Sequence, residues 1–244
     1  MIQELFIIDS ADAIRITICI VMLVVASIMD VRKREISDKV WVSALIAGGL
    51  VSIVLMPTHL QYDELLVRYL LSISLTAPLA YIAYIKGLFG GADAKALIVI
   101  SILVPSYEMH YSIHGIPALT VLTNASLLTL ANVLHNVLRN LTAILKGKDI
   151  FKGFDEPLYK KMLVFMMGYV ARPKGYLFAL EEVRDGKRMF NLAPKADSEF
   201  VEQSDEIWVT QALPFIIYIT IGFVLMLLVG DLIAYAINLT LLTK

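Results

Sequence analysis

The stretch GLFGGADAKALIVISILV, residues 87–104, joins a run of small residues to a long apolar run. Gly87, Gly90, Gly91 and Ala92 place four small residues directly before Asp93. Such a run breaks a helix and lets another backbone come close. The residues after Asp93 are almost all apolar. We therefore expect a membrane helix to begin here, with Asp93 at one surface of the bilayer.

The composition of the chain agrees with a membrane location. Of its 244 residues, 58% are hydrophobic and 18% are charged, and the mean hydropathy is +0.74, well outside the range of soluble domains. A membrane helix needs about 20 apolar residues. Runs of this kind lie at 13–31, 39–56, 65–86, 94–105, 116–138 and 212–237. The predicted fold class is an all-α polytopic membrane protein with about six transmembrane helices.

The basic residues predict an orientation. Eighteen of the 21 Lys and Arg residues fall between the first and second runs, around the junction of the third and fourth, or in 139–211. The positive-inside rule makes this side cytoplasmic and puts both termini outside. The first residues have no basic segment before the apolar run, so we expect the first helix to be retained rather than cleaved as a signal peptide.

The predicted domains are 1–139 with five helices, a cytoplasmic insert at 140–211, and 212–244 with the sixth helix. In the insert, GYLFALEEV (175–183) and KRMFNLAP (187–194) flank an Asp-Gly pair and predict a β-hairpin. Upstream, YKKMLVFMMGYV (159–170) suits either an amphipathic helix at the membrane surface or a further strand.

Two aspartates stand out because charge inside a membrane span is costly and is often functional. Asp30 ends the first predicted helix and Asp93 begins the fourth, so both lie at the same depth. Two such carboxylates can share a proton, so that one deprotonates a water while the other hydrogen-bonds a peptide carbonyl. The alternative is structural: Asp30 pairs with Arg32 or Arg34, and Asp93 caps a helix.

The sequence GGAD with Ala94 and Lys95 resembles the GxGD motif of membrane aspartyl proteases, as found in type IV prepilin peptidases and archaeal preflagellin peptidases. DVRKREISD, residues 30–38, is similar to the first motif of that family. The resemblance covers residues 10 to about 140. It implies that Asp30 and Asp93 are the catalytic pair and that Gly90, Gly91 and Ala92 form a backbone hinge.

Two departures from the family pattern refine this resemblance. Ala92 replaces the second glycine of GxGD, which points to the archaeal branch. The chain has one cysteine, Cys19, and no cysteine-rich loop, so the methyltransferase activity of some bacterial members is not implied.

Several neighbours of the two aspartates have competing interpretations. Asp38 is expected to cap the second helix, and Lys95 either tunes the charge of the site, binds substrate or reaches the interface. Asp231 is expected to pair with Arg15 or Arg68 near the outer face. A polar stripe at the end of the fifth helix either lines a substrate groove or hydrogen-bonds between helices; its members are Asn132, His135, Asn136, Arg139 and Asn140.

The resemblance implies an aspartic endopeptidase that removes short basic leaders from preflagellin or prepilin-like precursors with class III leader peptides, at the cytoplasmic face of the lipid bilayer. No cofactor, metal or nucleic acid is expected. A proton- or ion-coupled transporter, with the aspartates as a relay, is the first alternative. A scaffold protein with structural aspartates is the second.

Overall fold

The computed structural model describes residues 10–54, 62–172, 177–184, 187–192, 206–211 and 214–242. The chain divides into two compact units. Residues Met1–Leu128 with Pro214–Lys244 form the helical unit, and Thr129–Leu213 form the insert unit. Helix α5 contributes its first part to the helical unit and its second part to the insert unit.

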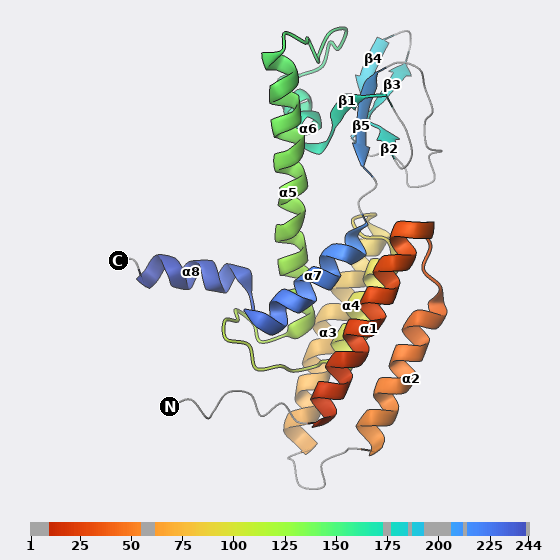
Figure 1. The fold of residues 1–244 in the computed structure, drawn as a ribbon, viewed down its shortest axis with the longest axis vertical. Coiled ribbons are helices and arrows are strands. Elements are labelled where there is room, and N and C mark those ends of the chain that lie inside the picture. The colour runs from red at the N-terminus through yellow and green to blue at the C-terminus, as the bar shows by residue number, and fades with distance from the viewer. Residues whose placement is uncertain are drawn as a thin grey trace. The chain divides into compact units, whose positions relative to one another are not determined.

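The helical unit is built from helices that begin and end close to the predicted apolar runs (Figure 1). They are α1 (Ser10–Lys33), α2 (Asp38–Val54), α3 (Tyr62–Ile85), α4 (Gly91–Leu103), α5 (Pro117–Leu145), α7 (Phe215–Leu228) and α8 (Leu232–Leu242). Three helices of the described chain are long and apolar enough to cross a membrane: α1, Leu66–Ile85 of α3, and α5. These helices indicate a membrane protein. The helices α2, α4, α7 and α8 are apolar but shorter.

The short helix α4 lies at the centre of the helical unit. It contacts α1, α2, α3 and α7. Its side chains Ala96, Leu97 and Ile100 are fully buried in the main apolar core, which also takes Leu23 of α1 and Phe223 of α7. Thirteen residues suffice for α4 because its neighbours cover it on several sides.

The prediction of one continuous sixth helix over 212–237 is wrong, because this segment forms two helices. Helix α7 ends at Leu228, and α8 begins at Leu232. Gly230 between them has a φ of 96°, a left-handed conformation that glycine adopts at little cost. A Cβ at this position would collide with the backbone oxygen of Tyr111. The apolar run is therefore two short helices, and hydropathy alone does not detect the break.

The insert unit combines the second part of α5 with α6 (Leu158–Met167) and two small sheets. One sheet has the order β1-β5-β2, all antiparallel, and the other pairs β3 with β4. The strands are β1 (Tyr169–Ala171), β2 (Leu177–Ala179), β3 (Glu181–Arg184), β4 (Lys187–Phe190) and β5 (Ile207–Gln211). Trp208 of β5 is buried against Phe151 and Phe190 in the core of this unit.

The predicted hairpin is confirmed as β3 and β4, with Glu182 opposite Met189. Its Asp-Gly turn lies outside the described residues. The first predicted strand differs from the prediction because it is split at Leu180, so that β2 pairs with β5 instead. The upstream segment contains both predicted kinds of element, since it begins as the helix α6 and continues as β1.

Candidate active site

Asp30 lies in the last turn of α1, where the helix is ended by its own backbone. Arg34 adopts a φ of 54°, and its N–H donates to the carbonyl oxygen of Asp30 at 2.9 Å. A left-handed residue at this position closes the helix, and only a few per cent of residues other than glycine adopt such a φ. The Asp30 side chain is half-buried, and the Arg34 charge is close enough to act on it.

The approach to Asp93 is set by the end of α3. Gly87 has a φ of 71°, and its N–H donates to the oxygen of Tyr84 at 2.9 Å. The N–H of Leu88 donates to the oxygen of Ala83, also at 2.9 Å. This pair of hydrogen bonds is a Schellman motif, which turns the chain out of α3. Among the small residues before Asp93, Gly87 is the one that needs glycine's freedom.

Helix α4 begins four residues after Gly87. Gly90 is extended, with φ −68° and ψ 156°, and Gly91 is the first helical residue. The carboxylate of Asp93 accepts a hydrogen bond from the Gly90 N–H at 3.0 Å. It therefore satisfies one free donor of the helix start, next to the positive end of the helix dipole. The structural interpretation of Asp93 as a capping residue is thus correct as geometry, and it also holds the carboxylate in a fixed place.

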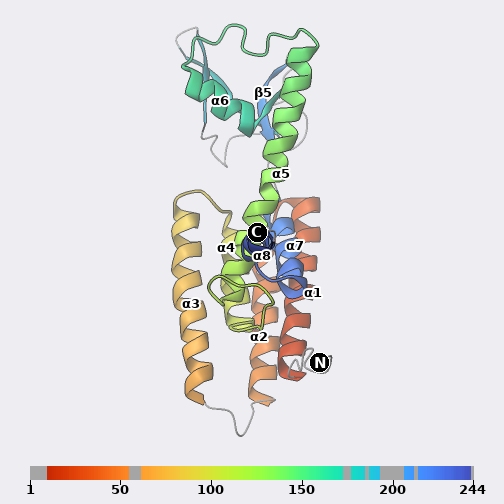
Figure 2. The ribbon, with the colours of Figure 1, turned by 90° about the vertical axis from the view of Figure 1, so that its left-hand side faces the viewer.

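The structure brings Asp30 and Asp93 to the same end of the helical unit. The C-terminal end of α1 and the N-terminal end of α4 lie side by side in both views (Figures 1 and 2), and the two helices are in contact. The two side chains are near enough for their charges to interact. Both are half-buried, so a group from solvent or from a substrate can reach them.

The other predicted hinge residues are compact and helical. Gly91 lies beside the ring of Tyr84, and Ala92 packs against the apolar core. Because Ala92 is inside α4, the third position of this motif has an ordinary helical φ and accepts a methyl group.

Lys95 and Asp38 form an ion pair that the sequence did not predict. Lys95 Nζ donates to Asp38 Oδ1 at 2.5 Å, which links the first turn of α4 to the first residue of α2. Both side chains are exposed. The cap of α2 is instead Ser37, whose hydroxyl accepts from the Lys39 N–H at 3.4 Å. The capping role expected for Asp38 is therefore wrong.

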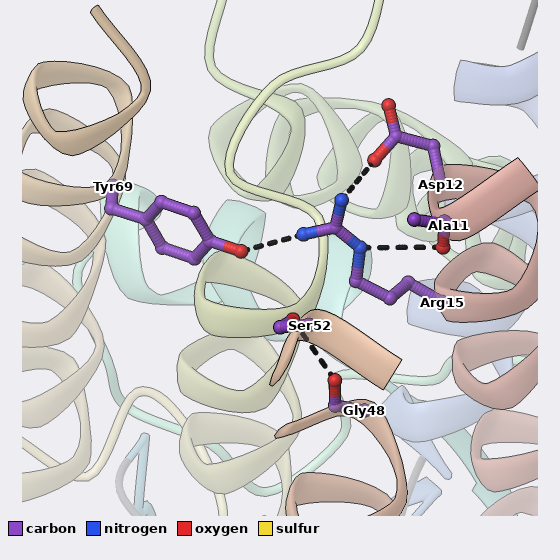
Figure 3. Close-up of polar contacts among 6 residues, drawn as sticks. All are labelled: Ala11, Asp12, Arg15, Gly48, Ser52 and Tyr69. Carbon is purple, nitrogen blue, oxygen red and sulfur yellow. Dashed lines mark hydrogen bonds and ion pairs between the residues drawn. The ribbon is translucent and has the colours of Figure 1, made fainter. Parts of the chain in front are cut away.

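The expected partnership of Asp231 with Arg15 is also wrong. Arg15 donates to Asp12 at 2.5 Å and to the Tyr69 hydroxyl at 2.6 Å, and its Nε donates to the Ala11 oxygen (Figure 3). Asp231 caps α8, because its Oδ1 accepts from the N–H groups of Ile233 and Ala234. The break in the sixth predicted helix explains the error, since it turns a mid-helix charge into a helix cap.

Three members of the polar stripe on α5 serve packing. Asn136 donates to the oxygen of Met166 at 3.1 Å, and Asn140 donates to the oxygens of Phe165 and Gly168 at 2.9 and 2.7 Å. The Arg139 guanidinium stacks 3.8 Å above the Tyr169 ring. These side chains fix α6 and β1 to α5, so the interpretation as hydrogen bonds between elements is correct for them.

Asn124 is a buried polar residue that the sequence analysis missed. Its amide donates to Gly230 at 2.9 Å, and its oxygen accepts from the Leu232 N–H at 3.0 Å. It therefore holds the break between α7 and α8. Across the described ranges, His, Cys, Asp and Glu side chains form no group of three or more that could hold a metal ion.

Two family models match the chain. The model of the type IV leader peptidase family matches residues 17–134, which include Asp30 and Asp93. The model described as the archaeal peptidase A24 C-terminus, type II, matches residues 160–232. These segments lie one after the other and together cover most of the chain.

Curated relatives agree with the two models. The chain is 26% identical over 214 residues to a preflagellin peptidase of Methanococcus maripaludis, covering 86% of this chain and 92% of the relative. It is 26% identical over 216 residues to a preflagellin peptidase of Methanocaldococcus jannaschii, covering 86% and 91%. The preflagellin peptidase of Methanococcus voltae is 25% identical over 222 residues, with 86% and 92% covered. From its motifs, its fold and these matches, the chain belongs to the type IV leader peptidase family.

Proposed function

We propose that this chain is an aspartic endopeptidase that removes leader peptides from preflagellin or prepilin-like precursors, with Asp30 and Asp93 as its catalytic pair. One observation carries the assignment of the pair: the end of α1 and the start of α4 place both carboxylates at one end of the helical unit, half-buried and within electrostatic reach of each other. The transporter alternative finds no support in the family and relatives that match.

The chemistry follows from two carboxylates that share one proton. The ionised carboxylate takes a proton from a water, whose oxygen attacks the carbonyl carbon of the scissile peptide bond. The protonated carboxyl hydrogen-bonds the carbonyl oxygen and stabilises the tetrahedral intermediate. The intermediate then collapses, the C–N bond breaks, and the leaving nitrogen takes the proton that the first carboxylate accepted from water. No metal or organic cofactor takes part in these steps.

The Gly90 N–H supports this role for Asp93. By donating to one carboxylate oxygen, it holds the side chain in a single rotamer and leaves the other oxygen for water or substrate. Gly90, Gly91 and Ala92 together form the small-residue segment that lets an extended substrate strand lie close to the backbone.

The topology in this proposal is multi-pass, with about six spans in the cell membrane. The distribution of basic residues puts both termini outside and the aspartates near the cytoplasmic face, where a precursor's leader precedes its apolar helix. Residues 1–139 then hold the catalytic pair, 140–211 the cytoplasmic insert and 212–244 the final membrane segment. The partners are the precursor proteins and the lipid bilayer, with no nucleic acid.

The test is cleavage of a preflagellin-like precursor by full-length protein, followed as a shift on a gel. Asp30→Asn and Asp93→Asn should each abolish leader removal while leaving the melting temperature in detergent nearly unchanged. Asp231→Asn, far along the chain in a helix cap, is the matched control and should keep most of the activity. The wild-type protein should remain active in EDTA.

Two results would contradict the proposal. Leader removal that persists in either catalytic variant would exclude that aspartate from the reaction. Activity that EDTA removes and zinc restores would replace the aspartic mechanism with a metal-dependent one.

A further inference from the structure

The helix α6 presents an unusual surface for the outside of a unit. Six large apolar side chains point away from the rest of the insert unit, with exposed fractions between 38% and 73%. They are Leu158, Tyr159, Met162, Leu163, Met166 and Met167. Their spacing of one and four residues places them all on one side of the helix, and we call this surface the α6 apolar face.

The opposite side of α6 is firmly held. Val164 is fully buried in the core of the insert unit. Asn136 and Asn140 of α5 donate hydrogen bonds to the backbone oxygens of Met166 and Phe165, so the C-terminal end of α6 is fixed to α5. The α6 apolar face therefore points outward because the opposite side of the helix is packed into the insert unit, and not because the helix is loosely attached.

Helix α5, to which α6 is hydrogen-bonded, also exposes apolar side chains. The part of α5 in the insert unit exposes an apolar stripe with spacings of three or four residues: Leu130, Leu134, Leu138, Leu141 and Leu145. Helix α5 is one of the helices long and apolar enough to cross a membrane. An exposed apolar stripe on such a helix is typical of a surface that faces lipid, and the C-terminal end of α6 is bonded to this helix.

Charge favours an anionic surface beside this face. Residues 139–161 hold six Lys and Arg residues against three Asp and Glu residues. Lys160 and Lys161 lie on α6 itself, on the side away from the apolar face, where Lys160 pairs with Glu156 and Lys161 lies over the Phe151 ring. An apolar face with aromatic and aliphatic side chains, opposite lysines, is the composition of helices that lie in the plane of a membrane surface.

We propose that α6 is an interfacial helix, which docks its apolar face into the headgroup region of an anionic lipid leaflet. Docking holds the insert unit against the membrane surface instead of free in solution. It requires only the membrane location of the protein and does not depend on the catalytic role of Asp30 and Asp93.

The experiment uses the full chain with Cys19→Ala, reconstituted into bilayers of phosphatidylcholine and phosphatidylglycerol without any precursor. A nitroxide label is placed at Met162 or Met166, and its collision rates with oxygen and with a water-soluble nickel complex are measured. Val183, an exposed residue of β3 in the same unit, is the reference for water. Val21, exposed on the candidate span α1, is the reference for lipid.

Labels at Met162 and Met166 should resemble Val21, with frequent oxygen collisions and few nickel collisions. Nickel collisions as frequent as at Val183 would overturn the proposal. Labels protected from both reagents would also overturn it, because protein then covers the face. So would labels that are open to nickel and become protected only when precursor is added, since the occupant would then be the substrate.

A second measurement uses the double variant Met162→Glu with Met166→Glu, and Val183→Glu as its control. The double variant should cleave precursor normally in detergent but lose several-fold activity in bilayers, whereas the control keeps its activity in both. Equal activity of the double variant in bilayers and detergent would count against a role for docking. Loss in both media would point to misfolding, and the collision measurements then decide whether the face meets lipid.

Discussion

Gly90 and Gly91 are neighbours before Asp93, but the space around them differs. A Cβ on Gly90 would lie 3.0 Å from Asp93 Oδ2, closer than ordinary contact. A Cβ on Gly91 would meet the Tyr84 ring at 3.5 Å, which is normal contact. Neither residue has a left-handed backbone. The need for glycine at position 90 is therefore a need for room beside the carboxylate.

Gly90→Ala should lower leader cleavage roughly tenfold, because it displaces the Asp93 carboxylate by a few tenths of an ångström in a site where small displacements are costly. The measurement is kcat/KM for leader removal with the melting temperature in the same detergent. Gly91→Ala is the matched control and should keep its activity. Ala92→Gly should also remain active, since position 92 is helical. A fully active Gly90→Ala enzyme would mean that the Asp93 carboxylate does not need the room that glycine leaves at position 90.

The Asp38–Lys95 pair tests whether Lys95 serves the reaction or the packing of α2 on α4. Exposed ion pairs contribute about 0.2–1 kcal/mol. Asp38→Asn and Lys95→Gln should therefore each lower the melting temperature by no more than about 4 °C and keep most of the activity. The exchanged double variant, Asp38→Lys with Lys95→Asp, should regain the lost stability.

A different result would assign Lys95 to the site. If Lys95→Gln loses most of its kcat, keeps its stability and shifts the pH profile of cleavage, the lysine tunes the charge of the aspartates. A rise in KM alone would instead indicate substrate binding. Asp38→Asn separates these cases, because it breaks the pair and leaves the lysine charge in place.

At the scale of single residues, the sequence placed Asp30 and Asp93 at one depth because a helix end and a glycine run mark where two spans meet the surface. It could not pair Lys95 with Asp38, which are 57 residues apart. It also offered Arg15 or Arg68 as the partner of Asp231, whereas the Arg15 guanidinium donates to Asp12 and Tyr69. Hydropathy gives the depth of a charge in a helix and not its direction around the helix.

At the scale of elements, the break between α7 and α8 shows a limit of apolar patterns. The break depends on Gly230, on Asp231 as the cap of α8, and on Asn124 from α5. Gly222 lets the backbones of α7 and α5 approach each other, since a Cβ at position 222 would lie 2.8 Å from the backbone oxygen of Val121 in α5. These contacts connect segments about 100 residues apart, and local sequence does not report them. The hairpin, by contrast, is local and was predicted.

Asn124→Ala should destabilise the helical unit because it leaves the Gly230 oxygen and the Leu232 N–H without their partner in a mostly buried place. The expected loss is about 2–4 kcal/mol, which corresponds to a fall of roughly 5–10 °C in melting temperature. Asn238→Ala, a half-buried asparagine of α8, is the control and should change the melting temperature little. An unchanged melting temperature in Asn124→Ala would show that the break does not depend on this side chain.

At the scale of the whole molecule, the chain has two units and two tryptophans, one in each. Trp41 is buried in the helical unit, and Trp208 is buried in the insert unit. The chain with Trp41→Phe therefore reports the insert unit alone by fluorescence. The composition predicted membrane helices for most of the chain, but the insert could be recognised only by its charge and its hairpin, because its core depends on aromatic contacts between distant segments such as Phe151 and Trp208.

The insert unit should be the part of the molecule that responds to acid. The hydrogen bond from Lys160 holds the pKa of Glu156 below its usual range, and the N–H of Phe190 adds to this effect. The pKa of Glu206 is lowered by its hydrogen bond with Lys148. A carboxyl group with a lowered pKa stabilises the fold above its unfolded pKa of about 4.3. This stabilisation is lost as the pH falls through the lower pKa of the folded state.

Glu156→Gln should therefore lower the melting temperature of the insert unit, reported by Trp208, at a pH of about 6, and the gap from the parent should shrink toward a pH of about 3.5, below the unfolded pKa of a glutamate. Both proteins are measured in the Trp41→Phe background, with Glu182→Gln, an exposed carboxylate of β3, as the control that should show no gap. In the Trp208→Phe background, Trp41 reports the helical unit and should show the same melting temperature with or without Glu156→Gln. A gap of equal size at both pH values would show that the ionised carboxylate is not the source of the stability. An equal fall in the melting temperature reported by Trp41 would show that the two units unfold together, because the Glu156–Lys160 contact lies within the insert unit alone.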